Sequence, residues 1–229
     1  MLTRSHAWLP SLEAALQPLL DPVEGQYPRP WLTDANDPAT ARVFIVGKNQ
    51  AKAFPSDAVT SKADFVDALF NRGAETCLAM YDRLSPTPSP TRRNLDRLAS
   101  ALADAGVGDV IQTNVVCFST PLSRDLGAHV LGRDAGRRIF RTLMRHGRVQ
   151  LLIAHGSGTV SELQRSFGWH LPPMPERPDD LREVAVENEG RPLRIIVIPS
   201  LAPPGYNKWA KWADEHFKVH VRRASVALI

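Results

Sequence analysis

Four short apolar runs constrain the fold of this chain more than any other feature of its sequence. They cover residues 42–46 (RVFIV), 110–116 (VIQTNVV), 149–154 (VQLLIA) and 194–198 (RIIVI). Each is rich in β-branched or other apolar residues and lacks a clean alternation of apolar and polar positions. That pattern is typical of strands that are covered on both faces, as in a parallel sheet.

Segments with helical spacing separate these runs. They cover residues 64–70, 94–105, 127–145 and 157–167; in the second of them, Leu95, Leu98 and Leu102 recur at intervals of three and four. Strands that alternate with helices predict an α/β fold, a three-layer αβα sandwich with a central, mainly parallel four-stranded sheet. The stretch before residue 199 suggests a hairpin that turns near Asn188-Glu189-Gly190 and leads into the last strand.

Length and composition indicate one globular domain over residues 1–229. Apolar residues make up 43% of the chain, which suffices for a core. We see no apolar run of about 18 residues, so we expect no membrane span. The two cysteines, Cys77 and Cys117, are too few for a disulfide framework, a zinc site or an iron–sulfur cluster. We therefore expect no metal, no cofactor and a reducing cytoplasm, with Cys117 as a buried, inert thiol.

The charge balance is mildly basic. The chain has 28 Lys and Arg against 24 Asp and Glu, which gives a net charge of +4 and a pI near 9.3. This excess permits a nucleic-acid partner without requiring one. The arginine clusters, such as the one between residues 133 and 148, are each better explained as solvated helix faces.

Amide, aromatic and histidine side chains, with loops rich in Gly and Pro, gather where the predicted strands end, which is where open α/β sheets bind their ligands. They are Gly47, Lys48, Asn49 and Phe54 after the first run, Asn114 within the second, His155 after the third, and Pro199, Ser200 and Leu201 after the fourth. An amide side chain offers a donor beside an acceptor, which matches the edge of a pyrimidine. An aromatic ring can stack on the base, a contact worth roughly 1–3 kcal/mol.

In this order, the residues resemble motifs of the uracil-DNA glycosylase superfamily. Gly47-Lys48-Asn49 is similar to the G-x-N of the mismatch-specific members, and residues 113–116 (TNVV) are similar to a stretch of the iron–sulfur branch. Pro199-Ser200 resembles the core of the H-P-S motif. The resemblance extends from about residue 42 to residue 205.

The resemblance implies a role for each of these residues. Asn49 would position the hydrolytic water, Asn114 would read the uracil edge, and Phe54 would stack on the flipped base. Gly47 and Lys48 would also contact the base, and main-chain N–H groups near Lys48 and Asn49 could hold its oxygen. The loop with Pro199 and Ser200 would press on DNA phosphates, and Leu201 would be the wedge.

Three departures from the motifs bear on catalysis. Ile198 stands where the H-P-S histidine is expected, and removing a comparable transition-state donor costs roughly 2.7–4 kcal/mol. His155 is the histidine that could substitute for it electrostatically, or touch a phosphate. Asn49 replaces a water-activating Asp, and an amide can orient water but cannot act as a general base. Gln50 replaces the usual Pro.

These observations predict a monomeric hydrolase that acts on DNA containing uracil or a related deaminated base. It would flip the nucleotide and hydrolyse the bond between C1′ and the base nitrogen, as in base excision repair. The alternative is a non-catalytic protein of the same fold that binds uracil-containing or single-stranded DNA. A deaminated purine is a further possible substrate, because its lactam edge has the same donor and acceptor.

Each motif also has a structural interpretation. Asn49 could be a capping residue, Phe54 could belong to the core, and residues 199–205 could be only a rigid turn. The sequence His155-Gly156-Ser157-Gly158 suggests an esterase, but the chain contains no G-x-S-x-G nucleophile motif. Ser157 is better explained as the N-cap of the following helix.

Overall fold

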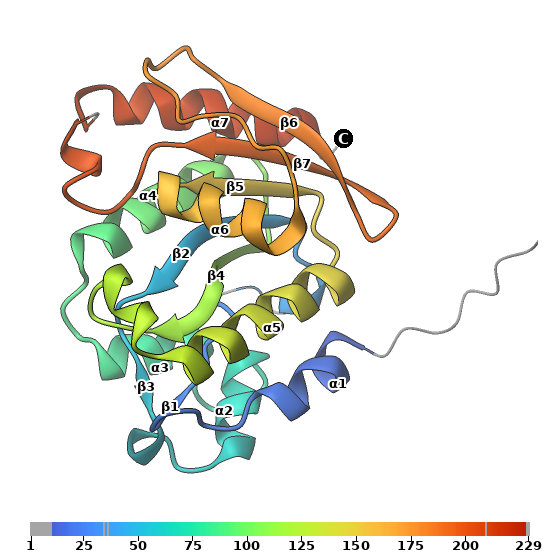
Figure 1. Ribbon diagram of the computed structural model, residues 1–229, viewed down its shortest axis with the longest axis vertical. Coiled ribbons are helices and arrows are strands. Elements are labelled where there is room, and N and C mark those ends of the chain that lie inside the picture. The colour runs from blue at the N-terminus through green and yellow to red at the C-terminus, as the bar shows by residue number, and fades with distance from the viewer. Residues whose placement is uncertain (1–10, 34, 36, 209, 228–229) are drawn as a thin grey trace, which may run out of the picture.

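The computed structural model describes residues 11–33, 35, 37–208 and 210–227 (Figure 1). Within them, five strands form the central sheet in the order β4-β2-β5-β7-β6. Their bounds are Val43–Gln50 (β2), Val110–Ser119 (β4), Leu151–His155 (β5), Arg182–Asn188 (β6) and Arg191–Ile198 (β7). The first four strands of that spatial order are parallel to their neighbours, and β6 is antiparallel to β7. The α/β sandwich is therefore confirmed, with one strand more than expected.

The additional strand, β6, comes from the predicted hairpin. The turn lies at Glu189 and Gly190, which both have positive φ values, of 52° and 76°. Along β6 most side chains remain partly or fully exposed. Because β6 is an edge strand, its sequence (REVAVEN) keeps charged residues at both ends of a short apolar stretch and does not resemble the four buried runs.

Helices cover both faces of the sheet. They are α1 (Leu12–Leu16), α2 (Lys62–Leu69), α3 (Cys77–Leu84), α4 (Pro90–Asp104), α5 (Val130–His146), α6 (Ser157–Phe167) and α7 (Ala213–Ala227). A separate pair of short strands, β1 (Gln26–Tyr27) and β3 (Phe54–Pro55), lies beside α2 (Figure 1). The bounds of α6 match the prediction, whereas α3 and α7 were not predicted.

Alternate residues of the strands face opposite layers. Val43 and Ile45 pack with α4 and α7 in one cluster of buried side chains. Phe44 and Val46 pack with α1, α5 and α6 in the other. Figure 1 shows α5 and α6 on the near side of the sheet, with α4 and α7 behind. Burial on both faces explains why these strands are almost entirely apolar.

Two loops that lead into helices also shape the site described below. The loop at residues 85–89 ends at Ser89, whose hydroxyl accepts a hydrogen bond from the amide of Arg92 at 3.1 Å and caps α4. Pro90 occupies the first turn of that helix, where no N–H is needed. The other helix, α6, begins directly after Gly156, whose φ of 86° favours glycine.

The two cysteines are free and buried. Burial raises the pKa of each thiol to about 12, so neither is a thiolate at neutral pH. This confirms the interpretation of Cys117 as a buried thiol. Across the described ranges, no helix has both the length and the apolar character needed to cross a membrane.

We predict that the close approach of α5 to β4 depends on Gly136. A Cβ at this position would lie 2.8 Å from the main-chain nitrogen of Cys117, so Gly136→Ala should lower the free energy of unfolding by about 1–3 kcal/mol. Urea denaturation measures this change. Gly108→Ala is the matched control, because a Cβ there meets nothing within 4 Å. Equal stability of the two variants would contradict the prediction.

Candidate functional site

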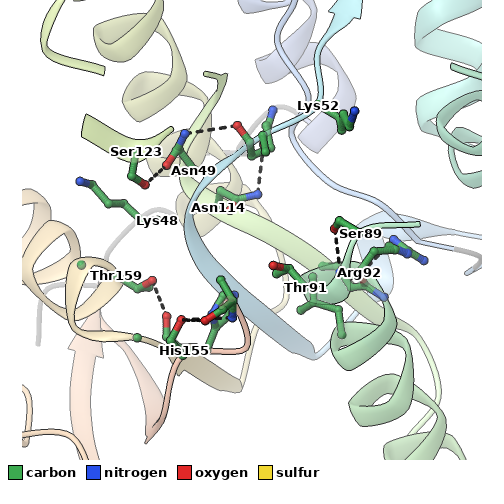
Figure 2. A pocket seen from close by; sticks show the side chains of 18 of the residues that line it. Lys48, Asn49, Lys52, Ser89, Thr91, Arg92, Asn114, Ser123, His155 and Thr159 are labelled. Carbon is green, nitrogen blue, oxygen red and sulfur yellow. Dashed lines mark hydrogen bonds between the residues drawn. The ribbon is translucent and has the colours of Figure 1, made fainter. Parts of the chain in front are cut away.

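A cavity of about 560 Å³ opens at the carboxyl ends of the parallel strands. The ends of β2, β4 and β5 line it, together with the N-terminal turns of α4 and α6 (Figure 2). Of the predicted site residues, it brings together Lys48, Asn49, Asn114, His155 and Ser200. Its volume is typical of pockets that bind small organic groups.

Gly47 lies where three strands meet. In the sheet register it is paired with Asn114 of β4, and its neighbour Val46 is paired with Ala154, the residue before His155. A Cβ on Gly47 would lie 2.6 Å from Oδ1 of Asn114 and 2.8 Å from Nε2 of His155. These two polar atoms are therefore no farther apart than the sum of those distances. Any side chain at position 47 would force them away from each other.

A chain of hydrogen bonds fixes the orientation of the Asn114 amide. The carbonyl oxygen of Arg29 can only accept, so it is Nε2 of Gln50 that donates to it, at 3.3 Å. Oε1 of Gln50 then faces Asn114 and accepts from Nδ2 at 3.1 Å. Since Oε1 cannot donate, Asn114 cannot turn its own oxygen toward Gln50. Oδ1 of Asn114 therefore stays on the Gly47 side, near His155.

A β-bulge places Gln50 for this role. Asn49 is paired with Val116, but the next residue, Gln50, is paired with Ser119, so the register shifts between them. A bulge bends the strand and redirects its side chains. Gln50 is 5% exposed, and its side chain bridges the main chain of Arg29 and the amide of Asn114.

The Asn49 side chain ties the end of β2 to the loop after β4. Nδ2 donates to Oγ1 of Thr120 at 2.9 Å and to the carbonyl oxygen of Gln50 at 3.2 Å. Oδ1 accepts a hydrogen bond from the hydroxyl of Ser123 (Figure 2). Both amide donors are thus engaged, and one lone pair of Oδ1 remains for a water molecule. Asn49 therefore has a structural role, which was the alternative interpretation of its sequence position. Its predicted role in binding the hydrolytic water depends on the remaining lone pair of Oδ1.

His155 is a neutral imidazole in this structure. Burial lowers its pKa to about 4. Nδ1 accepts a long hydrogen bond, of 3.5 Å, from the main-chain N–H of Leu201, so the ring proton lies on Nε2. Nε2 is the atom next to Gly47. His155 therefore offers an N–H donor beside Oδ1 of Asn114. In the sheet register it is paired with Ile198, the position where the motif has its histidine.

The loop after β7 is less exposed than expected. Pro199 is buried, and Leu201 is fully buried within the cluster beside α4 and α7. The Leu201 carbonyl accepts from Nδ2 of Asn94 at 3.0 Å. This placement does not fit a wedge that enters DNA, and the contribution of Leu201 to the site is the N–H bound to His155. Ser200 does line the cavity, where its hydroxyl donates to the carbonyl of Ala202 at 3.2 Å.

Phe54 does not line the cavity. It is 1% exposed and packs edge-on against Phe65, with ring centroids 6.0 Å apart. The guanidinium carbon of Arg29 lies 5.2 Å from its centroid. Phe54 thus has the core position that was the alternative to base stacking. The aromatic residues that do line the cavity are Trp31 and Tyr81.

The cavity is electropositive. Four cationic residues line it, Arg29, Lys48, Lys52 and Arg92, and none of the described residues lining it is a carboxylate. The N-terminal ends of α4 and α6 add partial positive charge. The side chain of Lys48 lies over the start of α6, because a Cβ on Gly158 would be 3.0 Å from Cδ of Lys48. The cavity therefore favours ligands that carry or develop negative charge.

Sequence reasoning missed several of the residues that build this site. Tyr81 comes from the unpredicted helix α3, and Arg29, Thr120 and Ser123 come from segments outside the predicted motifs. Gln50 was noticed only as a departure from a motif. In the described part of the chain, no group of three or more His, Cys, Asp or Glu is placed to hold a metal ion.

Comparison with known proteins gives no family assignment. No protein-family model matches the chain, and no curated protein matches it either.

We predict that the His155 ring makes folding pH-dependent. The pKa of His155 is about 4 in the folded chain and about 6.5 when unfolded. Between these values the unfolded chain binds a proton that the folded chain does not, so stability falls as the pH falls. Relative to wild type, His155→Gln should therefore gain about 2–3 kcal/mol of unfolding free energy on going from about pH 7 to about pH 4.

Urea denaturation at a series of pH values measures that difference. The buried His216 and His220 also have lowered pKa values, but they are present in both proteins and cancel in the comparison. A difference between the two proteins that stays constant with pH would contradict the neutral assignment of His155.

Proposed function

We propose that this chain is a DNA N-glycosylase that removes uracil, or a related deaminated base, from a flipped-out nucleotide. The observation that carries the proposal is the fixed amide of Asn114, whose Oδ1 stays on the Gly47 side of the cavity beside the N–H of His155. An acceptor and donors held at this spacing match the edge of a lactam base.

The orientation of Asn114 accounts for a preference for uracil over cytosine. Oδ1 would accept from the ring N–H of uracil, while the remaining hydrogen of Nδ2 would donate to a neighbouring carbonyl. Cytosine carries an acceptor at the same ring position, so it would meet Oδ1 with two lone pairs facing each other. Asn114 could bind cytosine only by rotating, and Gln50 opposes that rotation. A misplaced or unpaired buried polar group costs roughly 1–3 kcal/mol.

Bond cleavage in this proposal depends on stabilising the departing base. When the bond between C1′ and the base nitrogen breaks, negative charge moves onto the base and the sugar becomes oxocarbenium-like. The neutral His155 would donate from Nε2 to the developing oxyanion, and the cationic cavity would favour the same charge. Because no carboxylate is found among the described residues that line the cavity, water orientation falls to Asn49, and the DNA phosphates would balance the charge on the sugar.

The rim of the cavity offers the contacts that a DNA strand would need. Lys48 and Ser200 line it beside the N-terminus of α6, which favours phosphate groups. Leu122 is 49% exposed and lines the same cavity. In this proposal Leu122 replaces the buried Leu201 as the apolar residue that fills the space left by the flipped base.

A non-catalytic protein that binds uracil-containing DNA is the second candidate. It is favoured by one observation, the engagement of Asn49 with Thr120 and Ser123, which leaves the water a single acceptor. The same pocket would then recognise the base without cleaving its bond. Binding without cleavage distinguishes this candidate from the enzyme.

The proposal predicts that Asn114→Ala abolishes base excision. A 5′-labelled oligonucleotide with one uracil, single- or double-stranded, is incubated with the protein and then treated with alkali. Wild type should produce the cleaved strand, and the variant should be slower by about 100-fold or more, because both polar contacts to the base are lost. Gln164→Ala removes an exposed amide from α6 and should leave the rate unchanged. Near-wild-type cleavage by Asn114→Ala would place recognition elsewhere.

A mobility-shift assay on the same oligonucleotide completes this test. A shifted complex that wild type forms without any alkali-labile site would support the binding protein in place of the enzyme. If wild type produces no cleaved strand and also forms no shifted complex, both candidates are contradicted.

Gln50→Leu should weaken base discrimination. The variant lacks the acceptor that holds Asn114, so we expect kcat/KM for uracil to fall about ten-fold and the ratio of uracil to cytosine excision to fall with it. Gln26→Leu is a matched control, because Gln26 also donates to a main-chain carbonyl, that of Ser119, but does not line the cavity. An unchanged ratio in Gln50→Leu would show that the orientation of Asn114 has another cause.

A further inference from the structure

Among the residues that the structure describes, the guanidinium of Arg29 is a buried charge with no counter-ion. Arg29 is 6% exposed and lines the cavity. Its Nη1 atom is fully buried and has no hydrogen-bond partner within the described residues. Its close contacts are the rings of Tyr81 and Phe54, whose centroids lie 4.8 and 5.2 Å from the guanidinium carbon. No carboxylate in the described part of the chain forms an ion pair with it.

This arrangement is unfavourable unless an anion completes it. Burial lowers the pKa of Arg29, yet an arginine side chain remains protonated in proteins. An unpaired buried charge is strongly destabilising, and ring contacts compensate for only part of the loss of solvation. The guanidinium also holds several N–H donors in one plane, a geometry that fits the oxygen atoms of a phosphate or carboxylate.

A second arginine and a helix N-terminus lie beside Arg29. The guanidinium carbon of Arg92 lies 5.6 Å from the centroid of the same Tyr81 ring. Arg92 is 8% exposed and forms an ion pair with Asp96 at 2.6 Å, so this carboxylate is already engaged by Arg92 and is not a counter-ion of Arg29. The cavity wall continues into Ser89 and Thr91 at the N-terminal turn of α4, where the helix dipole favours an anion.

We propose that the wall formed by Arg29, Tyr81 and Arg92 is a binding site for a phosphate group. It lies in the same cavity as Asn114 but uses different residues, and its existence does not depend on glycosylase activity. The phosphate is either a diester of a DNA backbone or the monoester of a free nucleotide. Both the diester and the monoester carry anionic oxygen atoms that could serve as the counter-ion of Arg29.

Inorganic phosphate is the direct probe. Isothermal titration calorimetry of the wild-type chain with sodium phosphate, against sodium chloride at equal ionic strength, should show saturable binding that chloride does not reproduce. Arg29→Lys keeps the charge but loses the planar donor set, so it should weaken phosphate binding by about ten-fold or more. Arg148→Lys changes an exposed arginine in the same way and should have no effect.

Arg29→Met provides a second measurement. It removes the buried charge, so the rise in the midpoint of thermal unfolding that phosphate causes in wild type should disappear. If Arg29→Met does not fold, Arg29→Lys still decides. The proposal is overturned if phosphate stabilises wild type no more than chloride does, or if Arg29→Lys binds phosphate as tightly as wild type does.

Two further ligands identify the source of the phosphate. If Arg29→Lys weakens binding of deoxyuridine monophosphate but not of an oligonucleotide, the site takes a monoester; if it also weakens the oligonucleotide, the site takes a backbone phosphate. Asn114→Ala should keep the phosphate affinity of wild type. The two proposals can therefore fail separately. If the chain binds phosphate but excises no uracil, the phosphate site is supported and the proposed glycosylase function is contradicted.

Discussion

The absence of a side chain at Gly47 is the constraint on which the site depends. There β2 lies between β4 and β5, and Asn114 of β4 and His155 of β5 each place a polar atom within van der Waals range of the point where a Cβ would lie. Parallel strands bring their carboxyl ends to one edge of a sheet, so the polar residues that follow them converge without any long loop. Only glycine lets Asn114 and His155 approach each other so closely. The residues around them then determine how each side chain is oriented.

Buried arginines are neutralised differently in the cavity and elsewhere in the fold. Between α5 and α6, the partly buried Arg137 is paired with the buried Glu162 at 2.8 Å, which is the usual way to bury an arginine in a protein. In the cavity, Arg29 has aromatic rings where a carboxylate would be expected. The cationic lining would also lower the pKa of any acid that entered it. Such a pocket suits a reaction whose leaving group becomes an anion, and it suits a ligand that brings its own anion.

The sequence predicted the scaffold better than the side-chain contacts. Apolar runs and helical spacing depend on local periodicity, so the parallel strands and the bounds of α6 could be read directly. The edge strand β6 was harder, because one-sided burial gives it charged residues. Phe54 and Leu201 were assigned by their positions after motifs, but the direction of a side chain depends on contacts with Phe65 or Asn94 from distant segments. Arg29, between two prolines, carried no signal of its own.

The bulge at Gln50 links the local sequence to the chemistry proposed here. A regular strand would continue its pairing with β4 beyond Asn49, but the shift to Ser119 frees Gln50 to reach the main chain of Arg29. That single contact decides which end of the Gln50 amide faces Asn114, and so which atom of Asn114 faces the ligand. A proline at this position, as in the motif, could not transmit orientation in this way, because it has no polar side chain. Base preference in this chain would then rest on a residue that has no need to touch the base.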